Sequence, residues 1–308
     1  MVGLVQQEWS ERLSAIRLDI RKIVEGIRTG LHRSFRRGAS AVFVDHRDYT
    51  PGDDPRLIDW RASARKEGLV IKRLEQESEL ELHLWLDASA SMAFGEGAQE
   101  KARFAATLLA VFATLAQSQG DAVALTRFDE GVLEELPPRS SLSHLRLIEE
   151  NLAKPPARGA RTRLSVLGSK VNTSKRTTKR RGLIILASDL LDLDPHALDG
   201  LKAWTKGGFE FWVFQILHRE EIELPGNGPF RFEGLEGEPP VEADPAEIRS
   251  AYQRELQAHL ERQRNQLVEM GAFLRLVCTD ENIVDIVLQH LFFVKGALAR
   301  FGGHRRWA

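Results

Sequence analysis

An acidic residue and two hydroxyl residues follow one of the most apolar short segments of the chain. Asp87, Ser89 and Ser91 stand at alternate positions directly after Leu84–Leu86. Such an apolar run indicates a buried strand, and α/β proteins bind ligands where these strands end at the carboxyl edge of the sheet. Carboxylate and hydroxyl oxygens are hard donors that suit Mg²⁺ better than zinc or copper. Taken alone, however, the same residue types also cap helices and form turns.

Two later segments supply further oxygen ligands. Thr162 stands where a loop leads into an expected helix, and Asp189 ends a second apolar run, Leu183–Asp189. Three loops at one sheet edge would form an octahedral oxygen site with room for water, which we expect to be exposed and peripheral to the core. The pattern resembles the metal-ion-dependent adhesion site of von Willebrand factor A (vWA) domains. The predicted Mg²⁺ or Mn²⁺ ligands are Asp87, Ser89, Ser91, Thr162 and Asp189.

The elements that must position these residues alternate between strand and helix from residue 80 onward, which favours an α/β fold. Strands separated by helices predict a doubly wound, mostly parallel sheet covered on both faces, with Val132–Leu136 as an antiparallel edge strand. The other expected strands are Leu80–Asp87, Asp121–Phe128, Leu183–Asp189, Phe209–Leu217 and Phe273–Thr279. The expected helices are Lys101–Ser118, Leu142–Leu152, Thr162–Lys170, Pro195–Thr205, Ala246–Met270 and Ile283–Phe293.

The remaining segments define the expected domain organisation. Apolar residues from Trp9 to Leu31 recur at helical spacing, so we expect an amphipathic helix that docks against the protein's own core rather than a partner or a membrane surface. Residues 218–244 are rich in Gly, Pro and Glu and break the alternation, which indicates a small β excursion with a possible hairpin around Phe230–Gly234. The predicted units are an amino-terminal segment (1–79), a vWA-like domain (80–296) interrupted by 218–244, and a tail (297–308).

Composition restricts the class of protein. The 308 residues carry a formal net charge of −1, with 43% hydrophobic and 28% charged residues. A substantial core is therefore expected, and the chain as a whole has no electrostatic pull toward nucleic acid or anionic membrane. The single cysteine, Cys278, excludes an intrachain disulfide and is expected in the core. We find no apolar stretch long enough to span a bilayer and no signal-peptide pattern, so a cytoplasmic location is expected.

A charged segment before the first strand carries a more specific resemblance. The run from Arg47 to Trp60 resembles the signature of the DUF58 family. Lys72–Glu77 and Asp87–Met92 follow it at the spacing found in that family, and the resemblance covers roughly residues 30–290. This resemblance implies a vWA-like domain that acts as an adaptor or partner of MoxR-type AAA+ ATPases, whose genes commonly neighbour those of the family. We expect the acidic and basic residues to form ion pairs, with Trp60 packed beneath them. The signature residues, expected to be structural or part of an interface, are Arg47, Tyr49, Pro51, Gly52, Asp53, Asp54, Arg56, Asp59, Trp60 and Arg65.

Enzymatic alternatives find less support. The sequence has no P-loop, no G-x-S-x-G elbow and no H-E-x-x-H motif. Ser89 stands where a phosphatase with Asp87 as nucleophile would need a second acid, although a metal-dependent hydrolase using Asp87 and Asp189 stays open. The basic cluster 170–181 lacks aromatic residues, so nucleic acid binding is not favoured. The sequence predicts a non-enzymatic module that binds a MoxR-type ATPase, or its client protein, through a metal that captures an Asp or Glu of the partner.

Overall fold

The chain forms two compact units. The computed structural model describes residues 42–48, 60–64, 69–75, 80–156, 159–168, 181–193 and 195–300. One unit lies within His32–Glu79, and the other contains the residues from Leu80 onward. The helix expected over Trp9–Leu31 and nearly all of the basic cluster lie outside the described residues, and the predicted domain limits stay predictions.

The smaller unit is an antiparallel strand pair with one helical turn. Strand β1 (Val42–Asp48) pairs with β2 (Val70–Glu75), and Ser63 at the end of α2 (Trp60–Ser63) accepts a hydrogen bond from the Val70 amide. Trp60 is 68% exposed, and the expectation that it packs beneath the charged residues of the segment stays a prediction. Arg47 lies in β1 opposite Ile71. The other signature residues lie outside the described ranges: Tyr49, Pro51, Gly52, Asp53, Asp54, Arg56, Asp59 and Arg65.

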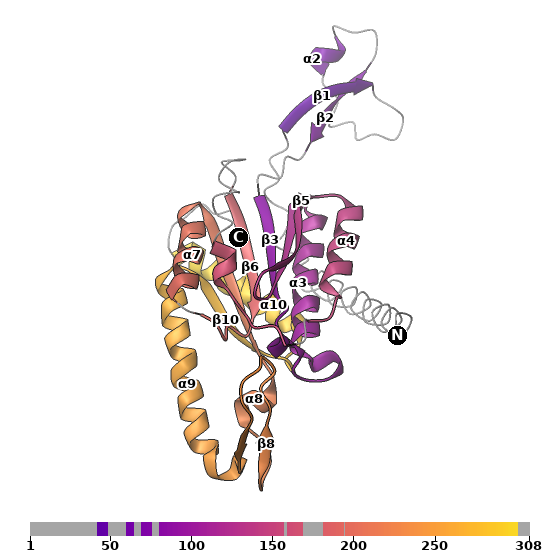
Figure 1. Ribbon diagram of the computed structural model, residues 1–308. Helices are drawn as coiled ribbons and strands as arrows, with labels where there is room; N and C mark the ends of the chain where they lie inside the picture. The colour runs from indigo at the N-terminus through magenta and orange to yellow at the C-terminus, as the bar shows by residue number, and fades with distance from the viewer. Residues whose placement is uncertain are drawn as a thin grey trace, which may run out of the picture. The chain divides into compact units, whose positions relative to one another are not determined.

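A six-stranded sheet organises the larger unit, with the strand order β10-β7-β6-β3-β4-β5 (Figure 1). All neighbours are parallel except β4 and β5, which are antiparallel and place β5 at the sheet edge. The predicted α/β class and the antiparallel edge strand are therefore confirmed. The strands are β3 (Leu80–Asp87), β4 (Ala122–Phe128), β5 (Val132–Arg139), β6 (Arg181–Ser188), β7 (Phe209–Leu217) and β10 (Phe273–Cys278).

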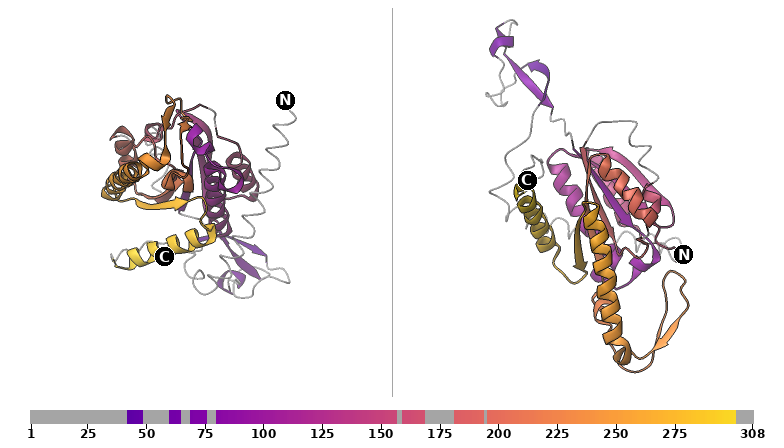
Figure 2. Two further views of the ribbon diagram at one scale, coloured as in Figure 1. Left: turned by 90° about the horizontal axis from the view of Figure 1, so that it is seen from below. Right: turned by 90° about the vertical axis from the view of Figure 1, so that its left-hand side faces the viewer.

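Helices cover both faces of this sheet, as predicted. Side chains in a strand point alternately to opposite faces, so Leu84 and Leu86 of β3 join one core and Trp85 joins the other. The first core includes residues of α3 (Lys101–Ser118), α4 (Leu142–Leu152) and α10 (Ile283–Arg300). The second includes residues of α5 (Ser165–Gly168), α7 (Pro195–Lys206) and α9 (Pro245–Glu269). Figure 2 shows α10 and α9 as well separated helices packed beside the sheet.

The order of the strands places the topological switch point of the sheet between β3 and β6. If the six strands are renumbered 1 to 6 in chain order, their order from β5 to β10 is 3-2-1-4-5-6. The chain adds strands on one side of β3 up to β5 and then, from β6 onward, on the other side of β3, so the topological switch point lies between β3 and β6. In open α/β sheets, ligands bind outside the carboxyl ends of the strands at this switch point. Asp87 is the last residue of β3, and Asp189 directly follows β6. The topology therefore brings both predicted carboxylates to the expected binding edge.

The 218–244 segment contains more regular structure than the sequence indicated. It begins with the short helix α8 (Arg219–Glu223), capped by His218, which was not predicted. Strand β8 (Phe230–Phe232) pairs with β9 (Val241–Ala243), so the hairpin is wider than the one expected within 230–234 and has its turn at 233–240. Its strands lie near α8 beyond the carboxyl edge of the sheet (Figure 1).

Most other element limits agree with the prediction within a few residues. The described part of α5 begins at Ser165 instead of Thr162, which leaves Thr162 on the loop before it. Helix α10 continues to Arg300, past the predicted end at Phe293, because the following residues include helix formers such as Ala297 and Leu298. None of the described helices is both long and apolar enough to cross a membrane.

Candidate metal centre

All the predicted metal ligands come together at the switch point. Asp87 and Ser89 are 0% exposed, Asp189 is 2%, Thr162 is 4% and Ser91 is 6%. Ser89 is the residue before the 3₁₀ helix η2 (Ala90–Ala93), and Ser91 lies within it. The expectation of an exposed, peripheral site is wrong, because side chains from α3 and from the 218–244 segment close over this edge of the sheet.

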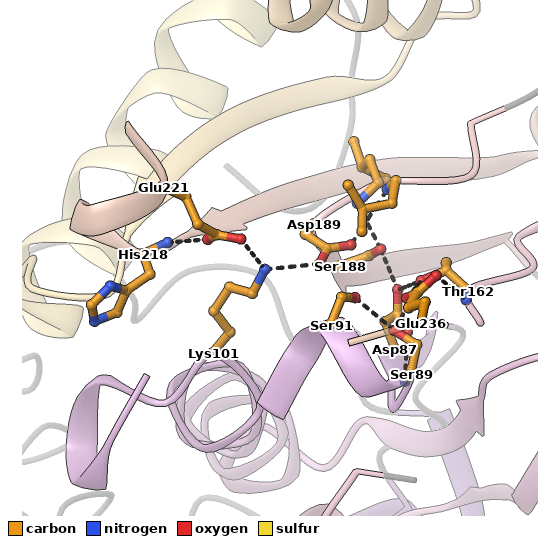
Figure 3. A network of polar contacts seen from close by, with 12 residues as sticks. Asp87, Ser89, Ser91, Lys101, Thr162, Ser188, Asp189, His218, Glu221 and Glu236 are labelled. Carbon is orange, nitrogen blue, oxygen red and sulfur yellow. Dashed lines mark hydrogen bonds and ion pairs between the residues drawn. The ribbon is translucent and has the colours of Figure 1, made fainter. Parts of the chain in front are cut away.

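Three hydroxyl groups form a chain next to the Asp87 carboxylate (Figure 3). Thr162 Oγ1 lies 2.9 Å from Ser89 Oγ, which lies 3.1 Å from Ser91 Oγ. Thr162 Oγ1 is also 3.4 Å from Asp87 Oδ2. Backbone bonds fix the loops that carry these groups, since the Ala90 amide donates to the carbonyl of Ala160. The hydroxyls are therefore presented by two mutually attached loops.

Hydrogen bonds fix the Asp87 carboxylate in place, but the partners that donate them are neutral and do not balance its negative charge. Ser188 Oγ donates to Asp87 Oδ2 at 2.6 Å, and the Ser89 amide donates to Oδ1 at 3.0 Å. Burial raises the pKa of Asp87 to about 7, and the nearby charge of Asp189 adds to this rise, while the hydrogen bonds from Ser188 and Ser89 oppose it. A cation placed beside Asp87 would remove this unfavourable electrostatic energy.

A buried lysine provides one positive charge on the other side of the site. Lys101, the first residue of α3, is 0% exposed. Its ammonium donates to Asp189 Oδ2 at 2.9 Å and to Glu221 Oε1 at 2.7 Å. Burial alone would lower the pKa of Lys101, but the charges of Asp189 and Glu221 outweigh it and the pKa is raised. Lys101 therefore stays charged and fixes Asp189 in place.

A carboxylate from the 218–244 segment completes the group. Glu236, in the turn between β8 and β9, is 8% exposed. Its Oε1 lies 3.1 Å from Thr162 Oγ1, and its Oε2 accepts from the Thr162 amide at 3.3 Å. Arg161 Nε donates to the carbonyl of Glu236. Sequence reasoning missed Lys101, Glu221 and Glu236. Glu221 and Glu236 belong to a segment without periodicity, and Lys101 stands at the start of a helix, where charged residues are common.

The composition of this group fits a hard divalent cation. The Thr162 hydroxyl has one proton, yet three oxygens, those of Asp87, Ser89 and Glu236, lie within hydrogen-bond distance of it. Three carboxylates of the group are buried, those of Asp87, Asp189 and Glu236. The ammonium of Lys101 contacts Asp189 and the partly exposed Glu221, whereas Asp87 and Glu236 contact the Thr162 hydroxyl. The described residues contain no metal-binding group of three or more His, Cys, Asp or Glu side chains. A metal held here would therefore need hydroxyl oxygens among its ligands, as in the predicted set for Mg²⁺ or Mn²⁺.

The fold and the site define an α/β domain of vWA-like architecture with an Asp-x-Ser-x-Ser, Thr and Asp set at its switch point. The family model described as "Protein of unknown function DUF58" matches residues 45–262, more than half of the chain, and the chain belongs to this family. Two curated relatives, Rv1480 of Mycobacterium tuberculosis H37Rv and Mb1516 of Mycobacterium bovis, are called uncharacterized. Each is 27% identical over 296 residues, covering 95% of this chain and 91% of the relative.

Solved structures with some similarity include vWA domains. BatB from Bacteroides thetaiotaomicron has a TM-score of 0.44 at 15% identity and covers 70% of this chain and 99% of its own. The SpRpn10 vWA domain has a TM-score of 0.37 at 8% identity, with coverage of 68% and 94%. A vWA protein from Catenulispora acidiphila has a TM-score of 0.33 at 12% identity, with coverage of 47% and 34%. Because these scores are low, the assignment of the fold depends on the strand order and directions described above.

Proposed function

We propose that this protein is a non-enzymatic, metal-dependent protein-interaction module. In this proposal Asp87, Ser89, Ser91, Thr162 and Asp189 hold Mg²⁺ or Mn²⁺, and an acidic side chain of a partner completes the coordination. The observation that carries the proposal is the excess of buried carboxylate over ammonium groups at the switch point of the sheet. Buried charge of one sign is costly unless a counter-charge accompanies it.

The composition of the ligand set explains why a carboxylate would be the preferred group of the partner. When bound, the metal would supply a coordination position for an anionic oxygen. The three hydroxyls are neutral, and Asp189 already shares its charge with Lys101 at 2.9 Å. Among the five proposed ligands, only the charge of Asp87 would then stand against the two charges of the metal, which would keep positive charge toward an incoming acid. The 2.6 Å hydrogen bond from Ser188 fixes the orientation of the Asp87 carboxylate, so Asp87 would need little rearrangement to bind the metal.

The proposed partner is a MoxR-type AAA+ ATPase or a client protein of such an ATPase, in the cytoplasm. This part of the proposal depends on the family resemblance of the signature segment, which is supported by the family match over residues 45–262. A single metal-bridged carboxylate is a small contact, and specific interfaces generally bury more surface than that. Further contacts would have to come from surfaces around the site.

A pull-down from native lysate with the full-length tagged protein tests this function. The wild type should retain the ATPase or its client in Mg²⁺ and lose it in EDTA. Asp87→Asn should lose the partner in both buffers. Asp199→Asn, at an exposed position of α7, is the matched control and should behave as the wild type. Partner binding that ignores both EDTA and Asp87→Asn would refute the proposal.

A metal-dependent hydrolase using Asp87 and Asp189 is the competing function. It receives less support, because Asp87 is fully buried and both of its oxygens accept hydrogen bonds, from Ser188 and from the Ser89 amide. A nucleophile or general base has to reach the reacting atom of a substrate. Metal-dependent turnover of a phosphate or peptide substrate by the isolated protein, lost in Asp87→Asn, would favour the hydrolase.

A further inference from the structure

The turn at 233–240 brings a carboxylate of the protein's own chain to the candidate metal centre. Glu236 is 8% exposed, and its two carboxylate oxygens contact the hydroxyl and the amide of Thr162 (Figure 3). Within the described ranges, no Lys or Arg side chain forms an ion pair with this carboxylate. A buried carboxylate that has only neutral hydrogen-bond partners is in an unfavourable environment. Its position next to Thr162 therefore needs an explanation beyond packing.

The turn has few other attachments to the domain. Among the described residues, the hydrogen bonds that join residues 233–240 to the rest of the domain all end on Glu236, from Arg161 and Thr162. The strands on either side are only three residues long, and Leu235 is 43% exposed. Releasing Glu236 would thus free the turn without opening either hydrophobic core.

The start of the same segment is attached more firmly. Glu221 of α8 accepts from the Lys101 ammonium at 2.7 Å, and Arg249 of α9 donates to the carbonyls of Leu224 and Gly226. The base of the segment is therefore fixed to α3 and α9. Its turn is held at the site by the contacts of one acidic residue.

We propose that Glu236 is an internal ligand that occupies the position of the partner's carboxylate, so the turn 233–240 must move aside when a partner binds. This inference rests on the proposed metal-dependent function. Glu236 has the same functional group as the acid that the site would take from a partner, and a tethered group competes at a high effective concentration. The unmodified protein accordingly binds external carboxylates weakly, and its partner needs further contacts to displace the turn.

Full-length protein loaded with Mn²⁺ and titrated with acetate tests this competition. Binding of Mn²⁺ is followed by electron paramagnetic resonance of the free ion, and binding of acetate by the loss of water-proton relaxation enhancement. Glu236→Gln should bind Mn²⁺ within about tenfold of the wild-type affinity and should respond to about tenfold less acetate, the changes expected if the wild-type site is open one-tenth of the time. Glu242→Gln, on exposed β9, is the matched control and should respond as the wild type.

The possible outcomes separate this inference from the proposed function. Equal acetate responses of Glu236→Gln and wild type, with intact Mn²⁺ binding, would overturn the internal-ligand role alone. A loss of Mn²⁺ affinity of about a hundredfold or more in Glu236→Gln would also overturn it, because Glu236 would then be needed to hold the metal and could not be displaced by a partner. Absence of Mn²⁺ binding by the wild type itself would refute the proposed function and the inference together. Circular dichroism melts of both variants are the control that each one folds.

Discussion

The ammonium of Lys101 lies 2.9 Å from Asp189 and 2.7 Å from Glu221, and it joins the candidate metal centre to helix α8. One ammonium between two carboxylates leaves the Asp87 side of the site without a positive charge. This arrangement accounts for the pKa of Asp87, which burial and the charge of Asp189 raise to about 7. The buried lysine and the proposed metal therefore have different roles, because Lys101 compensates Asp189 and the metal would compensate Asp87.

Lys101→Met should strongly destabilise the protein. The substitution keeps the length of the side chain but leaves Asp189, whose side chain is 0% exposed, without its ion pair. Removal of one partner of a buried ion pair costs about 3–5 kcal/mol. Urea unfolding should show this loss, whereas Lys206→Met, at an exposed position of α7, should change the free energy of unfolding by less than about 0.5 kcal/mol. A Lys101→Met protein as stable as the control would contradict the role given to this ion pair.

Asp87→Asn should leave the metal-free protein at least as stable as the wild type at pH 8. The raised pKa of Asp87 means that the folded state disfavours the charged carboxylate. A neutral amide of the same shape relieves this cost, although it changes the hydrogen bond with Ser188. Thermal melts in EDTA provide the comparison. A loss of more than about 1 kcal/mol in the variant would show that the hydrogen bonds of the carboxylate outweigh its burial.

Gly200→Ala should destabilise the contact between α5 and α7. A Cβ atom on Gly200 would lie 2.6 Å from the Cα of Gly168, so the two helices would have to separate. Overpacking of this kind typically costs about 1–3 kcal/mol, which exceeds the gain in helix propensity of about 0.5–1 kcal/mol. Because α5 follows the loop that carries Thr162, the affinity for Mg²⁺ should fall as well.

Gly131→Ala provides the control for this substitution, since a Cβ atom there meets nothing within 4 Å. Urea unfolding and calorimetry on both variants make the comparison. A Gly200→Ala protein that is more stable than the wild type would show that the close approach of the two helices does not constrain the fold.

His290 should make the protein sensitive to acid. Burial among Trp212 and Phe214 lowers the pKa of His290 to about 4, and the charge of Arg275 contributes. Because the unfolded chain binds a proton at higher pH than the folded one, this residue lowers stability as the pH falls from about 6.5 to about 4. The loss is on the order of 3 kcal/mol when titration is complete.

Unfolding free energies of wild type and His290→Gln, measured between pH 7 and pH 4, test this assignment. The wild-type curve should fall more steeply than that of the variant below pH 6.5, because glutamine does not titrate. Parallel curves would show that His290 takes up its proton in the folded protein.

The sequence was sufficient to predict the sheet and the ligands that strands position directly. Strand β3 and helix α3 have the predicted limits, because their apolar periodicity reflects burial along the whole element. Asp87 and Asp189 then follow from the rule that parallel strands end at a common edge. Such residues are set by local pattern together with a simple topology.

Residues that reach the site from irregular segments could not be predicted in this way. Glu236 and Glu221 belong to a stretch whose Gly, Pro and Glu content resembles a solvated loop, and no periodicity places them near Thr162 or Lys101. Lys101 itself appeared to be an ordinary charged residue at the start of a helix. The error about exposure has the same origin, since the groups that close over the site come from these unpredicted contacts.

Isothermal titration of Mg²⁺ into the metal-free protein at pH 8 shows whether these five residues hold a metal. We expect saturable binding of one ion per chain to the wild type. We expect no measurable binding to Asp87→Asn, because this variant loses the carboxylate beside the three hydroxyls. Equal binding isotherms for the two proteins, or no binding to either, would contradict a metal centre at Asp87, Ser89, Ser91, Thr162 and Asp189.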